Sequence, residues 1–138
     1  MSGRKDTLLI AIDLGTSFIK VGVYDAKSSC VAVETEPVKD YRPAPGIFIQ
    51  KGEELLGSVV ECMKKAAATL GDRSSQVEAI AFTGSLAYSD YFMGLITERI
   101  GFIAPVYLYP GENEMEALGD GCLRYLNGQE AKKVYPKH

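Results

Sequence analysis

The chain has 138 residues, 46% of them hydrophobic, and this length suits one domain around one core. A formal net charge of −3 gives no basic stripe for binding nucleic acid, so we expect no nucleic-acid partner. No apolar run reaches the ~18–20 residues of a membrane span, and we expect a cytoplasmic protein away from the membrane. The three widely spaced cysteines, Cys30, Cys62 and Cys122, are expected to be reduced core residues.

The first part of the chain has the pattern of three short strands. Thr7–Ile12 is a short β-rich run, and a strand pattern resumes over Phe18–Tyr24 after the polar turn 13–17. A second turn at 25–29 precedes Cys30–Pro37, where Val31, Val33 and Thr35 alternate with their neighbours. These patterns predict an antiparallel three-stranded meander.

Helical and strand patterns alternate in the rest of the chain. Apolar residues repeat at helical spacing from about Gly52 to Leu70, and the almost wholly apolar Val77–Phe82 predicts a central strand. A second helix is predicted over Tyr88–Ile100 and a fifth strand over Phe102–Tyr109. A last amphipathic helix follows, and Gly128 closes it.

The predicted element order is β-β-β-α-β-α-β-α, without an internal repeat or a linker. An antiparallel meander followed by right-handed crossovers is the topology of a ribonuclease-H-like domain. We therefore predict an α/β fold, a single ribonuclease-H-like domain over residues 1–138. Its five-stranded mixed sheet should carry helices on both faces.

The turn between the first two strands has the chemistry of a phosphate site. Gly15, Thr16 and Ser17 offer successive backbone N–H groups and two hydroxyls. The carboxylate of Asp13, just before the turn, could hold a metal ion through water. The same residues occur more often in a tight turn that binds no ligand. These residues alone therefore leave both interpretations open, a phosphate site and a plain turn.

Longer stretches around this turn resemble a known family. Ile12–Asp25, Tyr41–Gly46 and Ala79–Gly84 closely resemble the first part of FGGY-family carbohydrate kinases such as xylulokinases, over residues 1–84. The resemblance implies the actin-like ATPase superfamily of sugar kinases, Hsp70 and actin. It also implies ATP and Mg²⁺ as cofactors, with nucleotide phosphates at the hairpin turn.

The second part of the chain resembles a different family. Stretches 83–92, 98–106 and 109–118 look like the C-terminal end of butyrate kinases, in the acetate kinase group, over residues 83–135. We therefore divide the predicted domain into an FGGY-kinase-like half, 1–84, and a butyrate-kinase-like half, 85–138.

The second resemblance implies further site residues. The glycine-rich turn of butyrate kinases lies against the nucleotide, which implies contacts from Gly84 and Ser85, although Ser85 replaces the usual second glycine. The family pattern also places an acid near the metal at the start of the last helix. Glu114 is the best match, with Glu112 next, although carboxylates favour any helix N-terminus.

Both families hold ATP between two ribonuclease-H-like domains, whereas this chain has the length of one. A homodimer could supply the opposing half. The segment that carries the FGGY catalytic base has no counterpart, and Ile47, Phe48 and Ile49 make the sugar-binding stretch apolar. The basic phosphate-stabilising residues of butyrate kinases are also missing.

Three functions follow from these observations. The first is an ATP-dependent phosphotransferase, which would be a kinase with at most weak activity. The second is a non-catalytic module that binds nucleotide or self-assembles, as a truncated, recombined or engineered half-kinase would. The third, which we consider the least favoured, is a two-metal nuclease. Its carboxylates would be Asp13, Glu61 or Glu54, and Glu114 or Asp120.

Overall fold

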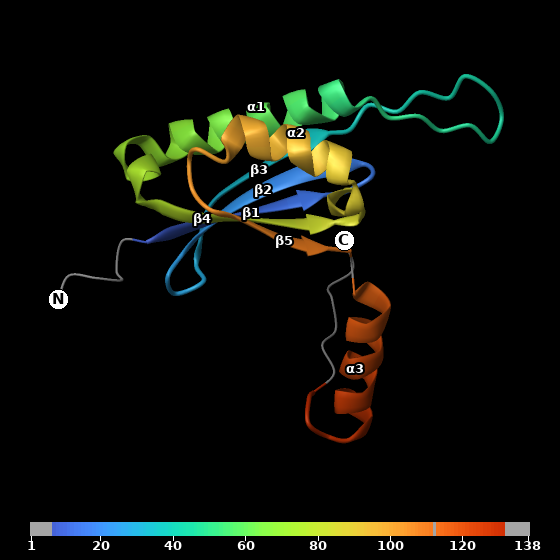
Figure 1. Ribbon diagram of the computed structural model, residues 1–138. Coiled ribbons are helices and arrows are strands. Elements are labelled where there is room, and N and C mark those ends of the chain that lie inside the picture. Colours follow the sequence, from blue (N-terminus) through green and yellow to red (C-terminus); the bar gives the residue numbers. More distant parts are fainter. Residues whose placement is uncertain (1–6, 112, 132–138) are drawn as a thin grey trace, which may run out of the picture.

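The computed structural model describes residues 7–111 and 113–131, without the side chain of Glu114. One sheet has the strand order β3-β2-β1-β4-β5 (Figure 1). β1 pairs antiparallel with β2 and parallel with β4, β2 pairs antiparallel with β3, and β4 pairs parallel with β5. The predicted α/β class and five-stranded mixed sheet are confirmed. The strands are β1 (Leu8–Leu14), β2 (Phe18–Asp25), β3 (Cys30–Pro37), β4 (Val77–Gly84) and β5 (Val106–Pro110).

The helices follow the predicted order, and the first has the predicted bounds. The second begins at Asp90, because Ser89 Oγ accepts a hydrogen bond from the Phe92 backbone N–H (3.2 Å) and caps it. Within the described residues, no helix is both long and apolar enough to cross a membrane. The helices are α1 (Gly52–Leu70), α2 (Asp90–Ile100), α3 (Glu114–Leu126) and the short 3-10 turns η1 (Gly71–Gln76) and η2 (Ser85–Tyr88).

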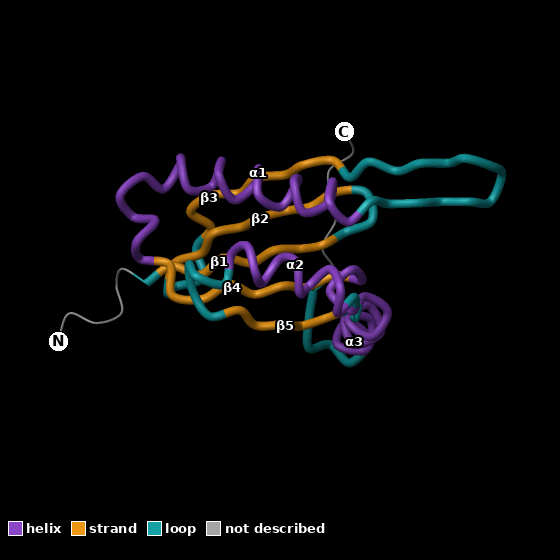
Figure 2. Tube along the Cα trace, turned by 45° about the horizontal axis from the view of Figure 1, so that its top comes forward, coloured by secondary structure: helices purple, strands orange, loops and turns teal. Residues whose placement is uncertain are grey.

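The core lies between the sheet and the pair α1 and α2, which both cover the same face (Figures 1 and 2). Alternate residues of β1 point to these helices and are buried. The apolar stripe of α1 packs on them from above. The largest fully buried side chains of this core include Leu8, Ile12, Leu14, Ile19, Ile80, Phe82 and Ile96.

The last helix differs from the expected arrangement, in which helices cover both faces. α3 projects away from the sheet beyond the end of β5 (Figure 1), and its apolar side chains are exposed, Met115 by 83% and Leu118 by 63%. Gly111 has a φ of 96° and turns the chain at the end of β5. The second face of the sheet is therefore uncovered within the described part of the chain.

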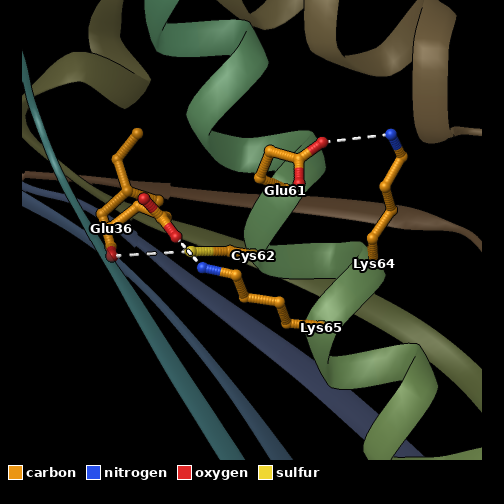
Figure 3. A network of polar contacts seen from close by, with 6 residues as sticks. Glu36, Glu61, Cys62, Lys64 and Lys65 are labelled. Carbon is orange, nitrogen blue, oxygen red and sulfur yellow. Dashed lines mark hydrogen bonds and ion pairs between the residues drawn. The ribbon is translucent and has the colours of Figure 1, made fainter.

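The three cysteines differ in burial, which corrects the expectation of three core thiols. Cys62 of α1 is buried, with its sulfur 3.9 Å from the carbonyl oxygen of Ile19 (Figure 3). Cys30 begins the edge strand β3 and Cys122 lies on the projecting α3, so both are exposed. Burial raises the pKa of the Cys62 thiol to about 11, and the nearby Glu36 carboxylate adds to the rise.

Thiol labelling checks this difference. At pH 8, in a chain that carries Cys122→Ser, we expect Cys30 to react rapidly with a disulfide reagent such as dithionitrobenzoate, and Cys62 to react only after denaturation. With a pKa of about 11, only about one Cys62 thiol in a thousand would be ionised at that pH, and the thiolate is the reactive form. A Cys62→Ala variant should lose only the reaction that appears on denaturation. Equal reaction of Cys30 and Cys62 in the folded protein would contradict this packing.

Candidate functional site

Two hydrogen bonds to backbone carbonyl oxygens hold the hairpin turn after β1 in place. Gln50 Nε2 donates to the carbonyl oxygen of Thr16 (2.8 Å), and the backbone N–H of Val38 donates to that of Ser17 (2.8 Å). A Cβ atom at Gly15 would lie 2.6 Å from the carbonyl oxygen of Phe18, so the turn needs glycine there. The exposed Thr16 and Ser17 can therefore offer their hydroxyls to a ligand from a fixed backbone.

Asp13 lies one residue before the end of β1. It pairs with Lys20 of β2 and Thr83 of β4 in the sheet, and alternation along β1 places its half-buried side chain on the uncovered face. Side chains directly opposite each other on antiparallel strands have Cβ atoms about 4.5–5.5 Å apart, so Lys20 is a direct neighbour of this carboxylate. Asp13 thus combines a fixed backbone with access to solvent.

Gly84 ends β4 beside the start of the hairpin turn. Its backbone has φ 97° and ψ 169°, a region that is nearly restricted to glycine. A Cβ atom there would lie 2.6 Å from the carbonyl oxygen of Leu14. Only glycine allows β4 to approach β1 this closely, so the fold brings the turn at Gly15 and the turn at Gly84 side by side.

The end of β5 joins the same edge. The backbone N–H of Gly111 donates to the carbonyl oxygen of Gly84 (3.0 Å), and Thr83 Oγ1 donates to that of Gly111 (3.3 Å). A Cβ atom at Gly111 would lie 2.5 Å from the Tyr88 hydroxyl, so this tyrosine packs directly on the glycine. Three turns therefore meet where the parallel strands end, a common position for ligand sites in α/β sheets.

Most of the residues predicted for the site lie along this edge. Asp13, the turn 15–17 and Gly84 are adjacent, and Ser85 is exposed at the start of η2. Glu114 begins α3, the next element after Gly111, but its side chain and all of Glu112 lie outside the described residues. The fold brings the first group together, and the metal role of Glu114 stays a prediction.

The carboxylates of the nuclease alternative are not gathered. Asp13 lies on the uncovered face, whereas Glu54 and Glu61 belong to α1, which covers the other face. Glu54 accepts a hydrogen bond from the Tyr41 hydroxyl (2.7 Å), which raises the pKa of that phenol. In residues 7–111 and 113–131, no group of three or more His, Cys, Asp or Glu could hold a metal ion. The geometry does not favour a two-metal site.

The roles of two residues that hold this edge together were not predicted from the sequence. Gln50 fixes the hairpin turn across 34 positions of sequence, and Tyr88 packs on Gly111 from η2. Neither belongs to a periodic pattern. The only available signal was a polar side chain next to a predicted helix start, which does not specify a partner.

The apolar stretch at the sugar-binding position lies on a long arm that extends beyond the sheet (Figure 1). Tyr41 and Ile49 pair at the base of the arm. Next to this pair, the guanidinium of Arg42 lies 5.7 Å from the centre of the Phe48 ring. Ile47, Phe48 and Ile49 are all about half-exposed, so the arm presents an apolar surface.

The sheet order and the three converging turns define the class of this protein as an α/β domain of the actin-like ATPase fold. The crystal structure of xylulose kinase from Rhodospirillum rubrum has this fold at a TM-score of 0.54 and 22% identity, over 57% of this chain and 16% of that one. The model of the FGGY family of carbohydrate kinases, N-terminal domain, matches residues 8–89. The chain belongs to the FGGY family of carbohydrate kinases.

The chain is also similar to butyrate kinases. It is 51% identical over 75 residues to "Probable butyrate kinase 2" of Caldanaerobacter subterraneus subsp. tengcongensis, covering 54% of this chain and 20% of the relative. It is 35% identical over 125 residues to "Butyrate kinase 2" of Clostridium acetobutylicum, covering 91% of this chain and 28% of the relative. The chain therefore spans less than a third of the length of these curated relatives.

Proposed function

We propose that this chain binds Mg²⁺-ATP at the edge where β1, β4 and β5 end. The observation that carries the proposal is the close approach of two glycine turns, in which Gly84 lies against Leu14 just before Gly15. Backbone without side chains lets phosphates approach N–H groups closely. Membership of a carbohydrate kinase family supports a nucleotide as the ligand.

Each residue of this edge has a defined part in the proposal. The N–H groups of Gly15, Thr16 and Ser17 and the two hydroxyls receive phosphate oxygens. Asp13 holds Mg²⁺ through water, with Glu114 as a second carboxylate. Mg²⁺ favours oxygen ligands and keeps several waters, so one or two carboxylates together with phosphates suffice.

Gly84 and Ser85 take the nucleoside side of the ligand. Ser85 is exposed at the start of η2, and its hydroxyl replaces the second glycine of the butyrate kinase pattern. A side chain at this position reduces how closely the nucleotide can approach the backbone. We therefore propose that the phosphates contribute more of the affinity than the nucleoside.

Catalysis has less support than binding. Phosphoryl transfer depends on positioning and on neutralising charge at the transferred group. Lys20 is the cation next to Asp13 and could neutralise part of this charge. We propose nucleotide binding with at most weak phosphotransfer, on a carbohydrate or carboxylate acceptor that stays open.

Calorimetric titration with Mg²⁺-ATP tests the proposal. We expect saturable binding that Asp13→Asn weakens by about 10–100-fold, as loss of a group that orients metal-bound water does. Asp72→Asn, the same charge change in η1 at the opposite end of β4, should leave the affinity unchanged. Binding that is absent, or equal in both variants, would overturn the proposal.

A phosphate-release assay on the same samples separates the two remaining functions. Slow release that Asp13→Asn abolishes would support a residual phosphotransferase or ATPase. Saturable binding without release would support a non-catalytic nucleotide-binding module. The exposed α3 and the uncovered sheet face favour self-assembly as part of the second function.

A further inference from the structure

The sheet presents an apolar surface on the face opposite α1 and α2, which we call the uncovered face. Its large members are exposed, Leu9 by 43%, Val33 by 61%, Tyr107 by 50% and Tyr109 by 64%. A β-sheet is stable when one of its faces is buried. A second face that is apolar and exposed is a candidate for an interface. The described elements leave this surface open to solvent.

The centre of the uncovered face is lined by small residues. Ala11 pairs with Ala81 in β4, and Ala81 pairs with Tyr107 in β5. On the other side, Ala11 pairs with Gly22, which pairs with Val33. The Tyr24 ring lies against Gly22, so the part of this row with only small side chains is Ala11 and Ala81, beside Tyr107.

α3 has an apolar stripe with no partner. Met115, Leu118, Cys122 and Tyr125 repeat at helical spacing, and all are exposed. The charged residues Glu116, Asp120 and Arg124 occupy the opposite side of the helix. The stripe is therefore shaped to pack on an apolar surface, with the charges left in water.

The composition of α3 indicates that it needs such a surface. The helix has 13 residues and contains Gly119 and Gly121, each of which costs about 1 kcal/mol relative to alanine. Isolated helices shorter than ~12–15 residues are marginal in water even with favourable sequences. Packing of the stripe would supply the missing stability.

α3 lies away from the uncovered face of its own sheet (Figure 1). Gly111 is held by hydrogen bonds with Gly84 and Thr83 and by the Tyr88 ring, and α3 begins three positions later. Figures 1 and 2 agree that the helix lies beyond the sheet edge. In this arrangement the stripe of α3 meets no part of its own sheet, and a second copy can receive the helix as it stands.

We propose that the apolar stripe of α3 packs on the uncovered face of a second copy, which returns its own α3 in the same way. Such an exchange has two-fold symmetry and closes on itself. A stable interface buries about 1,200–2,000 Å². The helix-on-sheet contact occurs twice in the exchanged dimer, so each contact needs to supply only half of that area. This dimer does not depend on nucleotide binding.

Cross-linking between differently tagged chains tests the exchange, with Cys122 as a natural probe on the stripe. A donor chain keeps Cys122, and an acceptor chain carries Ala81→Cys with Cys122→Ser; both carry Cys30→Ser. After mixing and oxidation, we expect a disulfide-linked donor–acceptor pair. A matched acceptor with Lys64→Cys, on the exposed side of α1 over the other face, should give none.

Two results would overturn the proposal. One is cross-linking between donor chains alone. The other is an intrachain disulfide, without dimers, in a single chain that carries both Ala81→Cys and Cys122, because the helix would then cover its own sheet.

Light scattering adds an independent measurement. The wild type is expected at twice the chain mass, and Leu118→Asp at the monomer mass. Leu118 is 63% exposed within its own chain, so this variant should keep the far-ultraviolet circular dichroism and the thermal transition of the remaining domain. A monomeric wild type at NMR concentrations would also overturn the exchange.

Discussion

Gly84→Val is expected to lower the free energy of unfolding by about 2–6 kcal/mol, the sum of a backbone held in a glycine-only region and an overpacked contact. The strain arises because φ is 97° and the new Cβ would lie 2.6 Å from the carbonyl oxygen of Leu14. Backbone cannot move aside as a flexible side chain can. Total stabilities of small domains are about 5–15 kcal/mol, so much of the population could unfold. Urea denaturation measures the change.

Gly57→Ala is the matched control for this substitution. Gly57 lies on the exposed surface of α1, and a Cβ atom there meets nothing within 4 Å. Alanine in a helix should raise the free energy of unfolding by about 0.5–1 kcal/mol. A Gly84→Val variant as stable as the wild type would show that β4 does not lie so close to Leu14.

Phe82→Ala is expected to cost about 3–5 kcal/mol of unfolding free energy, as large truncations in a packed core do. Phe82 is completely buried under the helices, two positions before Gly84. The cavity would remove the support of β4 just below the proposed site. Thermal and urea denaturation of the variant measure the loss.

Phe102→Ala removes the same side chain from a position that is 85% exposed. It should change the free energy of unfolding by no more than about 0.5 kcal/mol. If the two variants lost equal stability, the core would not be centred on Phe82 as described.

The regular elements of the first 84 residues were predictable because local patterns specify them. The period-two alternation, the turn at 13–17 and the helical repeat ending before Gly71 each involve neighbours in sequence. α1 has the predicted bounds, Gly52–Leu70, because Gly71, with φ 57°, ends the helical pattern. The fifth strand begins at Val106 and not Phe102, because apolar residues of a turn resemble a strand in sequence.

The surroundings of the helices could not be predicted from periodicity. The stripe of α3 indicates an apolar face, but the partner of that face depends on how the chain turns at Gly111. The same limit applies to Cys122, which shares the stripe but lies in solvent within one chain. Burial is a property of the assembled elements, and sequence spacing specifies only which residues share a side.

The candidate site was predicted in part, because glycine and acidic residues at strand ends suggest ligand chemistry. Asp13, Gly15 and Gly84 are adjacent as that interpretation requires. Gln50 and Tyr88, which fix the turns, come from distant segments. Their contacts depend on the tertiary fold, and no local rule indicates them.

The most direct test of a nucleotide site at this edge is amide chemical-shift mapping of the ¹⁵N-labelled chain with Mg²⁺-ATP. We expect the largest shifts at Gly15, Thr16, Ser17, Gly84 and Ser85, with a smaller response to Mg²⁺ alone near Asp13. The amides of η1, at the opposite end of β4, should stay unchanged. Saturable shifts confined to another surface, or no shifts at all, would contradict the proposed site.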